Sequence, residues 1–229
     1  MVVELSSIPR TNSRSRPSRE SKSGRRLGMP EERILLVEGR SDERVVRHVS
    51  RHHGVDRNFG IKAKEGYAKL LQSIELEVKA SGVRALGIVA DANDDIHARW
   101  QEIVGQLERA GVNAPKQPKH GGVVIEGLPR IGIWLMPDNQ NVGELEDFVR
   151  TLIPGHDPLW PRARKYVADI PEAHRKFKPA KRLKAQIHAW LAVQKQPGLI
   201  GAAIGEGQLD PDAPAATAFV KWLRDLFGG

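Results

Sequence analysis

Two carboxylates stand directly after apolar stretches of the chain. Glu38 follows Ile34–Val37, and Asp91 follows Ala85–Ala90. A carboxylate at the end of a buried strand loses hydration, and two such groups side by side repel each other. A bound cation compensates for both effects. Mg²⁺ is the cation we expect, with Mn²⁺ as its substitute, because it prefers oxygen ligands and takes only one or two protein carboxylates. We therefore predict that Glu38 and Asp91 anchor a divalent metal.

Further polar residues follow each of these two positions. Asp42 lies four residues after Glu38, at the start of a predicted helix, so its side chain could return to the same pocket. Asn93 could contribute its carbonyl oxygen without a charge. Asp94 and Asp95 open another predicted helix, and for them we favour capping, because acidic side chains stabilise a helix N-terminus. The metal set predicted here is therefore Glu38, Asp42, Asp91 and Asn93.

A third acidic group follows the apolar run at 131–136. Asp138 comes first, and Glu144 and Glu146 flank Leu145 in a short amphipathic helix from which Asp147 faces away. We expect a second metal, if one binds, to use Asp138 or one of the glutamates, for which we select Glu144. The alternative role of these glutamates is to stabilise the first helical turn.

A basic segment lies towards the C-terminus, where residues 161–195 carry ten Lys and Arg against two acidic residues. Lys181 and Lys184 share one helical face with His188, opposite an apolar stripe. A solvated charged face is the simplest interpretation. Phosphoryl transfer, however, needs a cation to offset the charge that develops on the phosphate. We select Lys181 for this role, with Lys178 and Lys184 as rivals, and expect all three to contact nucleic acid.

The elements that must position these residues follow from the alternation of apolar runs and helical periods. Strong strands are predicted at 34–37 and 85–90, a weaker one at 59–63 and two more at 123–126 and 131–136, with helices between them. Such alternation predicts an α/β fold with a parallel sheet covered by helices on both faces. Carboxyl ends of neighbouring parallel strands meet at one edge, where ligands of such sheets bind.

Three regions are predicted. Residues 1–28 hold seven basic and two acidic side chains among Ser, Pro and Gly, and we expect a disordered basic tail, either a nucleic-acid-binding arm or a solvated extension. Residues 31–155 form the α/β domain. Residues 156–229 form a basic helical extension packed on that core. The histidines at 48, 52 and 53 have no spacing that predicts a metal site.

Composition excludes several classes of protein. The 229 residues include no cysteine, which rules out disulfides, zinc sites built from cysteine and a cysteine nucleophile. The formal charge of +8 favours a polyanionic partner such as nucleic acid. No apolar run reaches the roughly 18 residues that cross a bilayer. We expect a soluble, cytoplasmic protein with no membrane partner.

The segment Leu36–Gly39 with Asp42, followed by Ile88–Asn93, resembles the TOPRIM domain of topoisomerases, primases and OLD-family nucleases. The resemblance covers residues 31–155 and is greatest for the TOPRIM domains of OLD-type nucleases and for small stand-alone bacterial TOPRIM proteins. It implies a Rossmann-like parallel sheet, metal held by the first-strand Glu and a later Asp-x-Asp, and a downstream Lys. The second Asp of that pattern is Asn93 here.

The function that the resemblance implies is metal-dependent hydrolysis of phosphodiester bonds in nucleic acid. The chain has no phosphate-binding loop of the Gly-x-x-x-x-Gly-Lys type, so an ATPase partner would act in trans. Its two tyrosines have no setting that predicts a topoisomerase nucleophile. The alternative is a TOPRIM-shaped module, weakly active or inactive, that binds nucleic acid or a partner. A third interpretation is a phosphoacceptor domain that uses Asp91, although the residues after Asp91 do not match the phosphoacceptor motif Asp-x-Asp-x-Thr/Val.

Overall fold

The computed structural model describes residues 32–198 and 200–228, so the basic tail predicted at 1–28 lies outside the described part. A five-stranded sheet has the order β2-β1-β3-β5-β4. Four strands are parallel and β4 pairs antiparallel with β5, because the short connection at 126–129 can join only antiparallel strands. The predicted sheet is thus confirmed as mostly parallel, with an antiparallel edge. The strands are β1 (Glu32–Val37), β2 (Gly60–Ala63), β3 (Val83–Asp91), β4 (Val123–Ile125) and β5 (Arg130–Met136).

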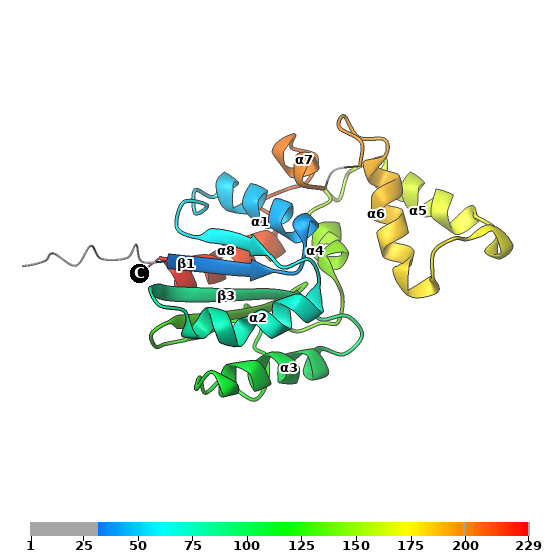
Figure 1. Ribbon diagram of the computed structural model, residues 1–229. Helices are drawn as coiled ribbons and strands as arrows, with labels where there is room; N and C mark the ends of the chain where they lie inside the picture. Colours follow the sequence, from blue (N-terminus) through cyan, green and yellow to red (C-terminus); the bar gives the residue numbers. More distant parts are fainter. Residues whose placement is uncertain (1–31, 199, 229) are drawn as a thin grey trace, which may run out of the picture.

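Helices cover both faces of this sheet, as predicted (Figure 1). The helices at 160–169 and 200–205 lie within the predicted helical extension, although no apolar stripe had located them individually. In chain order the helices are α1 (Arg40–His52), α2 (Tyr67–Lys79), α3 (Ile96–Arg109), α4 (Leu145–Thr151), α5 (Trp160–Asp169), the 3₁₀ turns η1 (Glu172–His174) and η2 (Pro179–Lys181), α6 (Arg182–Leu191), α7 (Ile200–Gly205) and α8 (Pro214–Phe227).

Successive side chains of the central strands point to opposite faces and enter different cores. In β1, Leu35 and Val37 pack in the cluster that contains residues of α1, α4, α7 and α8. Leu36 packs in the other cluster, with residues of α2 and α3. Both faces are therefore buried, which explains why β1 and β3 are continuously apolar rather than alternating.

Two glycines bring α8 onto the sheet. Gly87 of β3 and Gly132 of β5 are paired neighbours. A Cβ atom at Gly132 would lie 2.5 Å from Leu226 and 2.9 Å from Trp222, both of α8. The last helix is thus a layer of the core, and the segment after residue 155 contributes directly to the packing of the sheet.

The helices α5 and α6 pack on each other and project from the body of the molecule (Figure 1); we call residues 160–191 the α5–α6 arm. Its base is fixed by Asp157, whose Oδ1 accepts hydrogen bonds from the backbone N–H of Trp160 (2.6 Å) and from the indole of Trp190 (3.1 Å). Because α6 also contacts α4, the arm stands next to the carboxyl end of the sheet. None of the helices in the described ranges is long and apolar enough to cross a membrane.

Candidate metal centre

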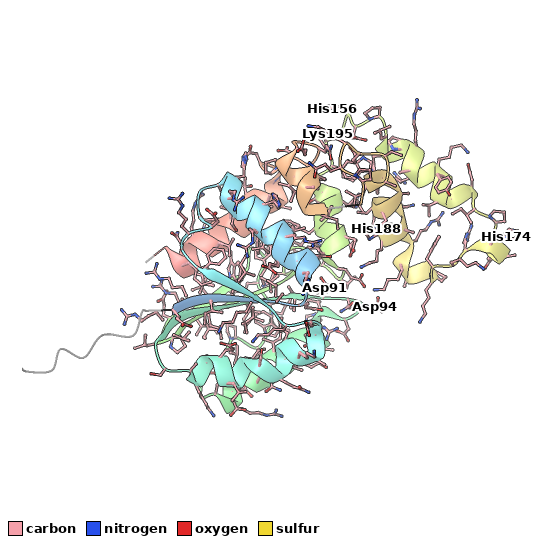
Figure 2. The ribbon with its side chains drawn as sticks, turned by 45° about the horizontal axis from the view of Figure 1, so that its top comes forward. Asp91, Asp94, His156, His174, His188 and Lys195 are labelled. Atoms are coloured by element: carbon pink, nitrogen blue, oxygen red, sulfur yellow. The ribbon has the colours of Figure 1, made fainter. Side chains whose placement is uncertain are left out.

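The structure brings Glu38 and Asp91 together at the carboxyl ends of β1 and β3. The strands are parallel neighbours with Val37 paired to Val89, so both chains leave the sheet at the same edge. The backbone N–H of Asp91 donates to Glu38 Oε1 at 2.8 Å. Figure 2 shows Asp91 and Asp94 at this end of the sheet. The adjacency predicted from two strand ends is therefore present.

Asp42 joins the same group from the first turn of α1. Its Oδ2 accepts the backbone N–H of Gly39 at 3.1 Å, which caps the helix. Its Oδ1 is buried and has no hydrogen-bond partner. A buried oxygen without a partner costs free energy, and native structures rarely leave one unsatisfied. Asp42 therefore has one oxygen used for capping and one left for a ligand.

Burial and the closeness of other carboxylates raise the pKa values of these three carboxyl groups. Burial raises the pKa of Asp91 to about 8, and the charges of Glu38 and Asp42 add to the effect. Burial also raises the pKa of Asp42 to about 6, helped by the charge of Glu38. The pKa of Glu38 is raised by burial, although the hydrogen bond from Asp91 lowers it in part. Ionisation of all three carboxyl groups is therefore unfavourable in the protein alone, and a bound cation would offset the repulsion between their negative charges.

Two further glutamates, from the start of α4, border the group and are paired with lysines of the arm. Lys181 forms an ion pair with Glu144. Lys184 Nζ lies 2.8 Å from Glu146 Oε1, and Glu146 is only 5% exposed. These pairs place two of the three selected lysines beside the acidic residues. Lys178, the third, is exposed and has no ion pair with any residue in the described ranges.

Asn93 links α3 to α4. With its amide oriented to suit its neighbours, Asn93 accepts from Arg99 Nη2 at 2.7 Å and donates to Glu144 Oε1 at 3.1 Å. Its backbone exchanges two hydrogen bonds with Gly143, at 2.8 and 2.9 Å. The amide predicted as a metal ligand is thus engaged by protein groups. An aspartate here would place one more negative charge beside Glu144, whereas the neutral amide connects Glu144 to Arg99.

Asp138, the other residue selected for a second metal, has its carboxylate engaged by the turn that follows β5. Its carboxylate accepts the backbone N–H groups of Gln140 and Asn141, at 3.0 and 2.8 Å. Burial raises its pKa, but these hydrogen bonds outweigh burial and leave the pKa lowered. Asp95 caps α3, as expected, and Asp147 closes the capping box of α4.

Sequence reasoning gave no role to Arg99, which borders the site. Arg99 lies over the ring of Tyr67, 3.5 Å from its centroid, and its charge lowers the pKa of Glu38. Only its place in the first turn of α3, the helix that follows β3, could have indicated this. Glu146, one of the two glutamates considered for a second metal, is buried and paired with Lys184.

The donor chemistry of these residues suits a divalent metal, although their oxygens are not already gathered around one point: among the described residues, the three ligand atoms that lie within 4.8 Å of one another belong to His52, His53 and Asp212. Among the residues that the structure describes, three carboxylates of the group have no cationic side chain paired with them: Glu38, Asp42 and Asp91. All their ligand atoms are oxygens, one of which is buried and unsatisfied. A hard ion such as Mg²⁺ or Mn²⁺ prefers this donor set and completes its shell with water or phosphate. We call Glu38, Asp42 and Asp91 the acidic cluster.

Comparison with known proteins gives a family. Neither the curated proteins nor the solved structures compared with this sequence gave a match. A family model matches residues 32–228, which takes in both the acidic cluster and the α5–α6 arm. The chain therefore belongs to the family described as "Protein of unknown function (DUF3226)".

Proposed function

We propose that the protein hydrolyses phosphodiester bonds in nucleic acid with the help of Mg²⁺. The observation that carries this proposal is the acidic cluster: three carboxylates without cationic partners in the described structure, at the carboxyl ends of two central parallel strands. Ligands of open α/β sheets bind at such ends. The resemblance of the same residues to the TOPRIM pattern supports the assignment and suggests the reaction class.

Glu38, Asp42 and Asp91 would hold the metal, which when bound supplies a Lewis acid and lowers the pKa of a coordinated water. The protein groups have separable tasks. Leu145 donates its backbone N–H to Asp91 Oδ1 at 2.8 Å and so fixes that carboxylate against α4. Asp91 must release its proton before it can bind a cation, because its pKa is about 8.

The lysines of the arm would meet the phosphate. Lys181 and Lys184 now neutralise Glu144 and Glu146, so their ammonium groups stand beside the acidic cluster. A phosphodiester bound there would attract both ammonium groups, and charge that develops on its oxygens would be stabilised by cations already in place. We assign Lys181 as the principal neutralising group. Its partner Glu144 accepts a hydrogen bond from the side-chain amide of Asn93, which lies just after β3.

The arm also suggests the substrate class. Among the described residues it carries six cations without an ion pair: Arg162, Arg164, Arg175, Lys176, Lys178 and Arg182. A cleft of about 540 Å³ between α5 and α6 is lined by Arg164, Lys165 and Arg182. Free cations at several points along an element suit the repeated phosphates of a nucleic-acid backbone, whose binding releases counterions.

Cleavage assays test the proposal. Supercoiled plasmid, single-stranded DNA and RNA are incubated with the protein in Mg²⁺ or Mn²⁺. We expect metal-dependent cleavage of at least one, and a loss of about 100-fold or more for Glu38→Gln. Glu108→Gln, an exposed glutamate of α3, is the matched control and should keep full activity. Undiminished cleavage by Glu38→Gln would refute the assignment. Binding without any cleavage would favour the alternative, an inactive binding module.

A further inference from the structure

We propose a second metal site, formed by His52, His53 and Asp212, that is separate from the acidic cluster and takes Zn²⁺. The two histidines lie at the C-terminal end of α1, whereas Asp42 of the acidic cluster lies in its first turn. Asp212 comes from the segment before α8. Among the described residues this is the group of His, Asp and Glu side chains whose ligand atoms all lie within 4.8 Å of one another.

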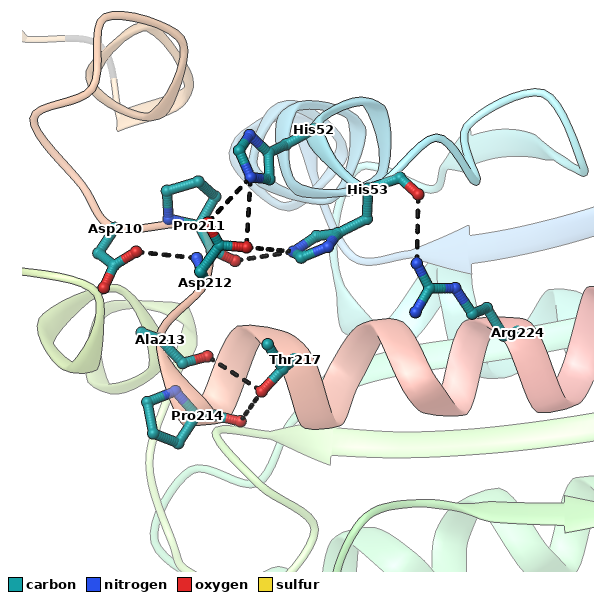
Figure 3. A network of polar contacts seen from close by, with 9 residues as sticks. All are labelled: His52, His53, Asp210, Pro211, Asp212, Ala213, Pro214, Thr217 and Arg224. Atoms are coloured by element: carbon teal, nitrogen blue, oxygen red, sulfur yellow. Dashed lines mark hydrogen bonds and ion pairs between the residues drawn. The ribbon is translucent and has the colours of Figure 1, made fainter.

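The ligand atoms already converge. His52 Nε2 lies 3.2 and 3.3 Å from the two oxygens of Asp212, and His53 Nε2 lies 3.7 Å from Oδ1 (Figure 3). Tetrahedral zinc with bonds of about 2.0–2.1 Å keeps neighbouring ligand atoms roughly 3.3 Å apart. The nitrogen–oxygen separations are close to that value and all three ligand atoms lie within 4.8 Å of one another, so small side-chain rotations would complete three corners of a tetrahedron.

The surroundings hold both segments in place. Arg224 of α8 donates to the backbone oxygen of His53 at 3.3 Å, and Asp210 Oδ1 accepts the backbone N–H of Asp212 at 2.9 Å (Figure 3). The ligand segments are thus anchored independently of any metal. Such support favours metal binding, since less conformational entropy is lost when the ligands are already positioned.

The donor set selects the metal. Two imidazole nitrogens and one carboxylate suit Zn²⁺, whereas Mg²⁺ prefers oxygen. Asp212 has no Lys or Arg partner among the described residues; its ion pairs are with the two histidines. One contact opposes binding, because His53 Nε2 lies 2.9 Å from the carbonyl oxygen of Pro211 and must be its donor.

The site is open to solvent, since the side chains of His52 and Asp212 are 45% and 64% exposed. An ion could enter directly, and a water could take the fourth position. Its effect would be structural. It would join the end of α1 to the start of α8, the helix that lies on Gly87 and Gly132 of the sheet. Binding to the folded state alone would raise stability by mass action.

Zinc titration of the untagged protein tests the proposal. Isothermal titration calorimetry is run in the Glu38→Gln/Asp91→Asn background, which disables the acidic cluster, so the result does not depend on the proposed hydrolysis. We expect one equivalent of Zn²⁺, no competition by excess Mg²⁺, and a loss of at least about tenfold in affinity on adding His52→Gln or Asp212→Asn. The control is His174→Gln, a histidine at the far end of the arm (Figure 2), which should leave binding unchanged.

Two further readouts separate this site from general surface binding. Co²⁺ should give the intense visible absorption of a tetrahedral ion, and the His52→Gln and Asp212→Asn variants should lack it. Zn²⁺ should raise Tm only when all three ligands are present. Absence of zinc uptake, or uptake that survives both substitutions unchanged, would overturn the proposal. Circular dichroism of each variant shows that a loss of binding is not a loss of fold.

Discussion

Mg²⁺ binding to the acidic cluster should release protons, and the amount follows from the structure. Burial and neighbouring carboxylates raise the pKa of Asp91 to about 8 and that of Asp42 to about 6. At about pH 7 the Asp91 carboxyl is therefore roughly 90% protonated and the Asp42 carboxyl roughly 10%. A bound cation requires both groups ionised, so about one proton leaves for each ion bound.

The same values set the pH dependence of affinity. At about pH 9 both groups are already ionised, so proton release should fall to about 0.1 per ion and apparent affinity should be about tenfold higher than at pH 7. Calorimetry in two buffers with different ionisation enthalpies measures the release directly. Asp91→Asn removes the principal titrating group, so this variant should bind Mg²⁺ more weakly and release little proton at pH 7.

Two results would refute this reasoning. One is proton release near zero at pH 7 in the unmodified protein, which would mean that the carboxylates are already ionised without a cation. The other is undiminished release by Asp91→Asn, which would place the displaced proton elsewhere. Glu108→Gln should behave as the unmodified protein in both buffers, since this side chain is exposed on α3.

Three other predictions concern stability and binding. Without metal, the folded state holds the Asp91 proton to higher pH than the unfolded chain. The contribution of Asp91 to the free energy of unfolding should therefore be fully present below about pH 4 and be lost, by up to about 6 kcal/mol, as pH rises through 8. In urea titrations, Asp91→Asn should flatten this part of the pH dependence. Gly132→Ala should destabilise the fold by about 1–3 kcal/mol, because the added methyl group would overpack against α8. Gly105→Ala is the control: this glycine lies in α3, a Cβ atom there would have no neighbour within 4 Å, and the substitution should be neutral or stabilising. Equal Tm values for the two variants would contradict this prediction. The double substitution Arg164→Glu/Arg182→Glu should weaken nucleic-acid binding in EDTA and make the affinity less dependent on salt concentration. Fluorescence anisotropy measures both effects. An unchanged salt dependence would show that the arm does not contact the nucleic acid.

The centre of the site was predictable because it depends on strand ends. Glu38 and Asp91 each follow an apolar run that only a buried strand explains, and parallel strands must end at one edge. Asp42 was predicted to join them because it lies four residues after Glu38, at the start of the next helix. Asp138 was expected near the metal for a similar reason, but its carboxylate is held by the turn after β5, and such a turn depends on backbone angles that residue type does not fix.

Contacts between distant segments were not predictable. The layer formed by α8 depends on Gly87 and Gly132 being paired in the sheet, which a pattern of apolar residues does not reveal. His52 and Asp212 are separated by 160 positions, and no spacing rule connects them. The pairing of Lys184 with Glu146 likewise required the arm to fold back against α4.

Anomalous diffraction from crystals soaked in Mn²⁺ tests the central claim most directly. The account predicts a manganese peak in contact with carboxylate oxygens of Glu38, Asp42 and Asp91, including the buried Asp42 oxygen that has no partner. It also predicts that the peak is lost from crystals of Asp91→Asn. Fully soaked crystals with no peak at the ends of β1 and β3, or a peak that Asp91→Asn leaves unchanged, would contradict the claim that the acidic cluster is a metal centre.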